Sequence, residues 1–243
     1  MKLNLTTFPT YKHVNKTDFY KKTAIVIDVL RASSTITAAL DNGCKDIVPV
    51  KKIGDAFAAK NAIKDGKPVF LGGEREGVKL SGYDFGNSPL EYSESLIRGS
   101  HVVLCTTNGT QAIAKAEYCD TMFIGCINNA SAVAKAAAEE QKDVIILCSG
   151  TSSIFSSDDI LAAGAIISKL QQFASVELDD LGTLALMLYN ENRSDPINFI
   201  KHTKPYKILT ALGYIADIEY CFKEDISQTV PVYVNGRIES FGK

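Results

Sequence analysis

Short apolar runs rich in valine and isoleucine recur between residues 24 and 148, and they constrain the fold more than any other feature of the sequence. Alanine-rich stretches with helical spacing lie between them. Runs of this kind are typical of strands buried on both faces, and their alternation with helices indicates a parallel sheet. The predicted strands are residues 24–30, 46–50, 68–71, 102–105, 122–126 and 144–148, and the predicted helices are residues 36–40, 53–63, 111–116 and 130–140. We therefore expect a three-layer α/β/α fold with a largely parallel or mixed sheet.

The last third of the chain is mainly helical in pattern. Helical spacing continues through residues 159–172, 178–191 and 206–222. The pair Asn235-Gly236 then lies between two apolar arms, which is the signature of a type I′ β-hairpin over residues 230–240. Because no linker or low-complexity stretch interrupts the sequence, we expect one domain over residues 1–243.

Two parts of the chain resemble each other. A shift of 75 positions aligns Thr35 with Thr110 and Cys44 with Cys119, and it keeps the predicted strands and helices in register. This pattern suggests two similar βαβ halves. Two unrelated βαβ units of similar length would give the same pattern, so both interpretations stay open.

The composition argues against several classes of partner. A net charge of −2 gives no reason to expect nucleic acid, and no apolar run approaches the roughly 20 residues that cross a bilayer. Residues 1–22 are polar and lack the apolar core of a secretory signal, and the six cysteines include no CxxC pair. We therefore expect a cytoplasmic protein with reduced thiols and no membrane partner. A homodimer is expected only because it is the commonest assembly.

The segment after the first predicted strand gathers an acid, a base and several hydroxyls. Asp28, Arg31, Ser33 and Ser34 lie between that strand and the next helix. Ligands of open α/β sheets bind at this edge, where helix N-termini and arginine side chains bind anions. We expect Asp28 and Arg31 to be catalytic and the two serines to bind substrate. Alternatively, Ser33 only caps the helix and Arg31 forms a surface ion pair.

The glycine-rich loop after the third predicted strand carries more charged residues. Glu74 and Arg75 lie in it, and Asp84 follows after a short gap. Carboxylates suit Mg²⁺, which takes one or two of them and completes its shell with water and substrate oxygens. We expect Glu74, Asp84 and Asp28 to bind the metal and Arg75 to bind substrate.

Asn87 and Ser88 follow Asp84 closely and are candidates for substrate binding. A proline comes directly after them. A capping residue followed by proline in the first turn is also a common start of a helix, so a structural role for this segment is an open alternative.

Two later loops repeat the pattern of polar residues at a strand end. The expected substrate-binding residues in these loops are Thr107, Asn108, Gly109, Thr110 and Ser149. Asp158 and Asp159 open the helix after the second loop, where acids either complement the helix dipole or take a metal or water-orienting role. We take Asp159 as a catalytic candidate.

Several common catalytic signatures are absent from the sequence. No Gly-Lys-Ser or Gly-Lys-Thr of a Walker A loop occurs, nor a GxGxxG after a strand, nor the GxSxG of a serine hydrolase. The three histidines, His13, His101 and His202, lie far apart in the sequence and outside the polar loops. The sequence therefore gives no indication of nucleotide binding or of a histidine general base.

Taken together, these motifs resemble those of the 2-phosphosulfolactate phosphatases of coenzyme M biosynthesis. The matching segments follow in order through most of the chain: Asp28-Val-Leu-Arg-Ala-Ser-Ser-Thr, Gly72-Gly-Glu-Arg, Asp84-Phe-Gly-Asn-Ser-Pro, Thr106-Thr-Asn-Gly-Thr, Cys148-Ser-Gly and residues 159–164. One departure is Asp158, where the family favours Glu. The resemblance implies Mg²⁺-dependent hydrolysis of (2R)-2-phospho-3-sulfolactate to 3-sulfolactate and phosphate.

The attacking group stays open at this point. Water, Asp28 and Cys148 are the candidates, and we favour water. Leu30 stands where the DxDx signature of aspartyl-phosphate enzymes has its second Asp, and no Arg follows Cys148 at the CxxxxxR spacing of cysteine phosphatases. Two other functions also fit the loops: a phosphatase for another small phosphorylated hydroxy acid, and a non-catalytic protein that binds small organic anions.

Overall fold

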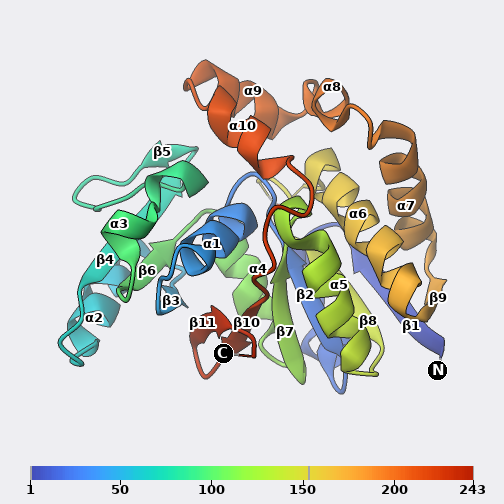
Figure 1. Ribbon diagram of the computed structural model, residues 1–243, viewed down its shortest axis with the longest axis horizontal. Coiled ribbons are helices and arrows are strands. Elements are labelled where there is room, and N and C mark those ends of the chain that lie inside the picture. The colour runs from blue at the N-terminus through green and yellow to red at the C-terminus, as the bar shows by residue number, and fades with distance from the viewer. Residues whose placement is uncertain (1, 153, 243) are drawn as a thin grey trace.

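Eleven strands form one mixed sheet in the computed structural model, which describes residues 2–152 and 154–242 (Figure 1). They are β1 (Lys2–Phe8), β2 (Thr23–Ile27), β3 (Asp46–Pro49), β4 (Val69–Arg75), β5 (Val78–Lys79), β6 (His101–Cys105), β7 (Thr121–Gly125), β8 (Val144–Cys148), β9 (Ser175–Leu178), β10 (Pro231–Val234) and β11 (Arg237–Ser240). Their order across the sheet is β5-β4-β6-β3-β11-β10-β7-β2-β8-β1-β9, and most neighbouring strands are parallel. The predicted α/β class and all six predicted strands are confirmed.

Helices pack on both faces of this sheet. They are α1 (Ala32–Asp41), α2 (Ile53–Ala62), α3 (Glu94–Ile97), α4 (Gly109–Ala116), α5 (Ala130–Glu139), α6 (Ser157–Phe173), α7 (Asp180–Asn192), α8 (Pro196–Ile200), α9 (Lys204–Ala211) and α10 (Ile215–Cys221). Side chains of β2 alternate between the faces: Ile25 and Ile27 pack on the side of α5 and α6, whereas Val26 packs on the side of α1 and α4. Among the described residues, no helix is long and apolar enough to cross a bilayer.

The structure contains elements outside the sequence-based expectation, namely β1, β5, β9, α3 and α8, and one predicted helix is divided. The polar N-terminal stretch contains β1, in which Leu3 and Leu5 are buried and alternate with exposed polar residues. A search for continuous apolar runs misses a strand of this alternating kind. The helix predicted over residues 206–222 is two helices, α9 and α10, because Gly213 adopts a φ of +84° that ends the first of them.

The two similar halves are interleaved across the sheet. β3 and β7 begin 75 residues apart, at Asp46 and Thr121, and so do β4 and β8, at Val69 and Val144. β6, the first strand of the second half, lies between β3 and β4. β2, the first strand of the first half, lies between β7 and β8. The halves therefore exchange their first strands. The loop after β2 lies beside strand ends of the second half, and the loop after β6 lies beside strand ends of the first half.

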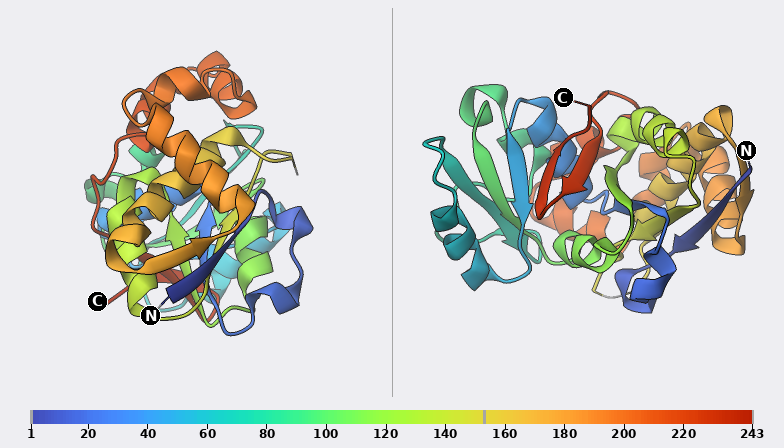
Figure 2. Two further views of the ribbon diagram at one scale, coloured as in Figure 1. Left: turned by 90° about the vertical axis from the view of Figure 1, so that its right-hand side faces the viewer. Right: turned by 90° about the horizontal axis from the view of Figure 1, so that it is seen from below.

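The C-terminal hairpin joins these two parallel groups. Asn235 and Gly236 have φ values of 49° and 84°, and both central residues of a type I′ turn require positive φ. β10 pairs antiparallel with β7 and β11 pairs antiparallel with β3. The hairpin, red in Figure 2, thus joins two groups of parallel strands that would otherwise form separate sheets.

Candidate active site

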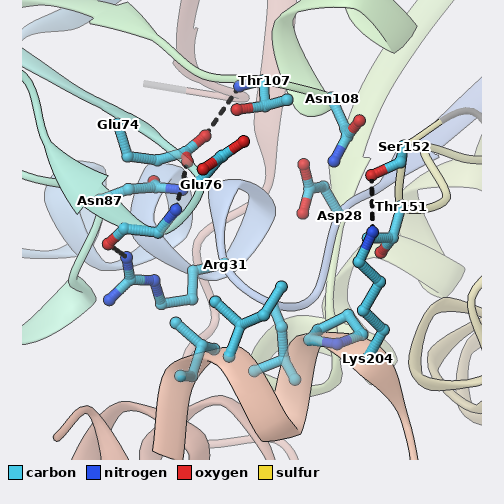
Figure 3. A pocket seen from close by; sticks show the side chains of 15 residues that line it. Asp28, Arg31, Glu74, Glu76, Asn87, Thr107, Asn108, Thr151, Ser152 and Lys204 are labelled. Carbon is cyan, nitrogen blue, oxygen red and sulfur yellow. Dashed lines mark hydrogen bonds between the residues drawn. The ribbon is translucent and has the colours of Figure 1, made fainter. Parts of the chain in front are cut away.

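A cavity of about 400 Å³ lies at the carboxyl ends of β2, β4, β6 and β8, against α9 (Figure 3). Its lining residues are Asp28, Leu30, Arg31, Glu74, Glu76, Gly77, Asn87, Thr107, Asn108, Thr151, Ser152, Lys204, Pro205, Ile208 and Leu209. This is the edge at which ligands of α/β sheets bind. The exchange of first strands brings the loops after β2, β4 and β6 to this one place.

Asp28 directly follows β2, and its side chain lies between those of Glu74 and Ser152 in Figure 3. Burial, followed by the negative charges of Glu74 and Asp158, raises the pKa of Asp28 to about 7. The backbone amides of Ala32 and Gly109, at the starts of α1 and α4, bond to the carboxylate and partly oppose this shift. The site therefore holds more negative charge than its surroundings neutralise, which favours a bound cation.

Glu74 is held in place by two backbone amides. Thr107 N donates to Oε1 at 2.7 Å and Gly77 N donates to Oε2 at 2.9 Å. Arg75 lies outside the cavity lining, because successive side chains of a strand point to opposite faces. Its guanidinium donates instead to Cys105 Sγ at 3.3 Å. The geometry does not bring Arg75 to the substrate position expected for it.

Arg31 forms a buried ion pair at the wall of the cavity. Its Nη1 lies 2.6 Å from Asp217 Oδ2, its Nη2 donates to Gly77 O at 3.0 Å, and its guanidinium lies 4.3 Å from the ring centroid of Tyr214. Ser88 Oγ donates to the other oxygen of Asp217 at 2.7 Å. The alternative of a surface ion pair is therefore wrong. Ser88 acts on Arg31 through Asp217 and lies outside the cavity lining.

Asp159 connects two loops in the way that Glu74 does. Val29 N donates to Oδ1 and Gly150 N donates to Oδ2, both at 2.9 Å. Val29 lies two residues beyond β2, as Thr107 lies two residues beyond β6, so Asp159 and Glu74 accept from equivalent loop amides of the two halves, although Glu74 lies on β4 and Asp159 on α6. Burial and neighbouring carboxylates raise the pKa of Asp159 well above its usual value. Asp159 lies outside the cavity lining.

Three predicted binding residues form hydrogen bonds within their own loops. Ser33 Oγ accepts from Asp28 N at 3.2 Å, and Ser34 Oγ donates to a carbonyl of the same loop at 2.9 Å. Thr110 Oγ1 donates to Thr106 O at 2.9 Å. Ser33 does not cap α1, since this helix already begins at residue 32. These residues shape the loops and lie outside the cavity lining.

Asp84 lies apart from the other two predicted metal ligands, Asp28 and Glu74. Its Oδ2 accepts from Leu71 N at 2.7 Å and lies 3.5 Å from Lys60 Nζ, and the residue is not part of the cavity lining. Leu71, which donates this hydrogen bond, lies within β4, and Lys60 belongs to α2. The chain therefore directs Asp84 toward α2, and the geometry does not unite the three acids in one site.

Three buried polar atoms of predicted site residues have no hydrogen-bond partner within the described chain: Asn87 Oδ1, Thr107 Oγ1 and Ser149 Oγ. An unsatisfied buried polar atom costs about 1–3 kcal/mol. Asn87 and Thr107 line the cavity, whereas Ser149 does not. Asn108 also lines the cavity, and the backbone amide of Gly109 bonds to the Asp28 carboxylate. Asn87 Oδ1 and Thr107 Oγ1 can thus each form a hydrogen bond to a ligand in the cavity.

The family described as 2-phosphosulpholactate phosphatase matches residues 8–236. This chain belongs to that family. A protein of Clostridium acetobutylicum named probable 2-phosphosulfolactate phosphatase is 44% identical over 218 residues, which are 89% of this chain and 92% of that protein. A protein of the same name from Caldanaerobacter subterraneus subsp. tengcongensis is 39% identical over 237 residues, which are 97% of this chain and 98% of that protein. The predicted family resemblance is confirmed.

In this member of the 2-phosphosulfolactate phosphatase family, sequence reasoning missed the residues on one side of the cavity. Lys204 and three apolar residues come from α9, and Ser152 comes from the loop after β8. Glu76, which follows β4 on the opposite side beside Glu74, was missed as well. A lysine in the first turn of a helix opposes the helix dipole, and this is the signal that could have drawn attention to Lys204. Nothing in the local sequence pairs it with Ser152.

The donor set of the cavity fits a sparsely ligated metal. Among the described residues, no group of three or more His, Cys, Asp or Glu side chains is arranged to hold a metal ion. Asp28 and Glu74 line the cavity together, and both are buried. One or two carboxylates, completed by water and substrate oxygens, are the usual protein contribution to a Mg²⁺ site. These two residues fit that pattern.

All six cysteines are free, as predicted. Cys148, one candidate for the attacking group, is buried at the end of β8 and lies outside the cavity lining. Burial, followed by the charges of Asp159 and Asp158, raises the pKa of the Cys148 thiol well above its usual value. Because the thiolate is the nucleophilic form, this environment disfavours attack by Cys148.

Proposed function

We propose that this protein hydrolyses the phosphate ester of (2R)-2-phospho-3-sulfolactate to 3-sulfolactate and phosphate, with Mg²⁺ as cofactor. The observation that carries the proposal is the pair of buried carboxylates, Asp28 and Glu74, in a cavity at the carboxyl ends of the strands. The names of the related proteins support the choice of substrate.

The charges of the cavity support a metal cofactor. Three carboxylates line it, those of Asp28, Glu74 and Glu76, against two cations, Arg31 and Lys204. The charge of Arg31 is already paired with Asp217. A substrate with phosphate, carboxylate and sulfonate groups would be repelled by such a lining. Glu74 and Asp28 would hold Mg²⁺, which supplies positive charge to the phosphate oxygens when it is bound.

We propose direct attack by water, with Asp28 orienting the water toward phosphorus. The new bond joins the water oxygen to phosphorus while the bond from phosphorus to the ester oxygen breaks. One proton of the water ends on the ester oxygen, and the other stays with the released phosphate. Arg31 lines the wall with its charge paired to Asp217, and the N–H groups that Asp217 and Gly77 leave free would donate to an equatorial oxygen. The hydroxyl of Thr107 would donate to another substrate oxygen, and Asn87 Oδ1, which only accepts, would accept from the attacking water.

The test is a phosphate-release screen with 2-phosphosulfolactate and other phosphorylated hydroxy acids, with and without Mg²⁺. We expect release from 2-phosphosulfolactate that EDTA abolishes and Mg²⁺ restores. Release from none of the esters would overturn the phosphatase function and favour an anion-binding protein. Release that EDTA does not change would overturn the metal alone. The homodimer and the cytoplasmic location stay predictions, which light scattering and cell fractionation would test.

A further inference from the structure

We propose that Lys204 and Ser152 bind the sulfonate of the substrate, on the side of the cavity opposite Glu74. The inference rests on the proposed phosphatase function and assigns one part of the site to one part of the substrate. Figure 3 shows Lys204 extending from α9 toward Ser152, with Asp28 between this pair and Glu74. Glu74, Glu76 and the Asp217-paired Arg31 thus lie on one side of the lining, and Lys204 lies on the other.

Lys204 is the cation of the cavity whose charge is not already used. The guanidinium of Arg31 is paired with Asp217, bonded to Gly77 O and stacked on Tyr214. Among the described residues, no carboxylate lies within 4.0 Å of Lys204 Nζ, which donates only to Ser152 Oγ, at 3.1 Å. A second anionic group of the substrate would meet a free ammonium here.

The position of Lys204 argues for a ligand rather than for a role in the fold. It is the first residue of α9, whose N-terminus already carries partial positive charge, so a lysine there is electrostatically unfavourable. The side chain is exposed, and its removal breaks no ion pair. An anion bound to the ammonium would turn this unfavourable position into a favourable one.

The chemistry of the substrate matches the two sides of the cavity. Its phosphate and carboxylate are carried by the same carbon, whereas the sulfonate is carried by the next carbon and projects away from them. With the phosphate held at Asp28 and Glu74, the sulfonate points away from the acidic side. Ser152 Oγ accepts from Lys204, so its own proton is free to bond a sulfonate oxygen. Leu30 and Ile208 line the cavity and offer apolar contact to the methylene carbon that carries the sulfonate.

Paired substrates and a matched variant test the assignment. The substrates are 2-phosphosulfolactate and 2-phospholactate, which differ in the sulfonate. We expect Lys204→Met to raise KM for 2-phosphosulfolactate about tenfold to a hundredfold, the usual worth of a charge-assisted hydrogen bond, with kcat within about twofold. For 2-phospholactate, kcat/KM should stay within about twofold. Lys204→Arg should retain part of the preference. The control is Lys207→Met, an exposed lysine of the same helix outside the cavity, which should behave as wild type.

Two kinetic results would overturn the sulfonate assignment: no change in KM for 2-phosphosulfolactate in Lys204→Met, or an equal loss for both substrates. Calorimetric binding of 3-sulfolactate and of lactate gives a readout that needs no turnover. If the wild type released no phosphate, the proposed function would fail, yet weaker 3-sulfolactate binding in Lys204→Met would still support the sulfonate site. Equal 3-sulfolactate affinity in wild type and Lys204→Met would overturn it.

Discussion

Arg31 and Asp217 lie 186 positions apart in the sequence and form a buried ion pair with a distance of 2.6 Å. Arg31 belongs to the loop after β2, and Asp217 belongs to α10. The pair therefore connects the wall of the cavity to the C-terminal helices. Ser88 donates to the second oxygen of Asp217 and completes its bonding.

Asp217→Asn should destabilise the protein strongly. It removes one partner of a buried ion pair, and the uncompensated charge of Arg31 would cost about 3–5 kcal/mol. Urea unfolding measures this loss. Ser88→Ala removes one hydrogen bond from the same carboxylate and should cost only about 1 kcal/mol. Equal effects of the two substitutions would contradict the importance given to the ion pair.

Glu74→Gln and Asp84→Asn compare two of the three acids predicted to bind the metal. We expect Glu74→Gln to lose at least about a hundredfold in kcat and to lose the rise in melting temperature on adding Mg²⁺, because it removes a ligand charge. Asp84→Asn should keep kcat within about threefold and should keep the rise in melting temperature on adding Mg²⁺, since Asp84 is bonded to Leu71 N and faces Lys60. A Mg²⁺ response that survives in Glu74→Gln would show that the metal binds elsewhere.

Gly109→Ala should disturb the position of Asp28. A Cβ at residue 109 would lie 2.7 Å from Ala32 Cβ and 2.8 Å from Asp28 Oδ2, which is too close for either contact. We expect kcat/KM to fall at least about tenfold and the melting temperature to drop. Gly54→Ala is the control, because a Cβ there meets nothing within 4 Å and alanine stabilises a helix by up to about 1 kcal/mol. Wild-type activity in Gly109→Ala would contradict this packing.

Asp158 should make the metal-free protein less stable as the pH rises. Burial raises the pKa of Asp158 to about 6 from a usual value of 3.8. The folded state thus holds a proton that the unfolded state has lost, and this contribution is complete below about pH 4 and is lost as the pH rises through about 6. Two pKa units correspond to about 3 kcal/mol.

Urea unfolding in EDTA at a series of pH values measures the contribution of Asp158. Asp158→Asn should flatten the decline between about pH 4 and pH 7. Asp180→Asn, at the exposed start of α7, should keep the slope of the wild type. An unchanged slope in Asp158→Asn would show that other groups cause the decline.

Six strands of the first 150 residues could be predicted because buried parallel strands carry continuous apolar side chains, as in Val144–Cys148. β1 could not be found in this way, since it buries only alternate residues. The interleaving of β2 between β7 and β8 could not be predicted either. The shift of 75 positions shows that two units are similar, but the choice of partner strand depends on packing between segments far apart in the chain.

The sequence by itself determined which residues lie at the carboxyl ends of the strands, because the loop positions of Asp28, Glu74 and Thr107 follow from the apolar pattern before them. It could not determine which of them share a cavity. Strand alternation turned Arg75 away, and hydrogen bonds to β4 turned Asp84 toward α2. Only the tertiary structure brought Lys204 and Asp217 to the site. The physical reason is that contacts between residues so far apart depend on how the helices pack on the sheet, which no local pattern encodes.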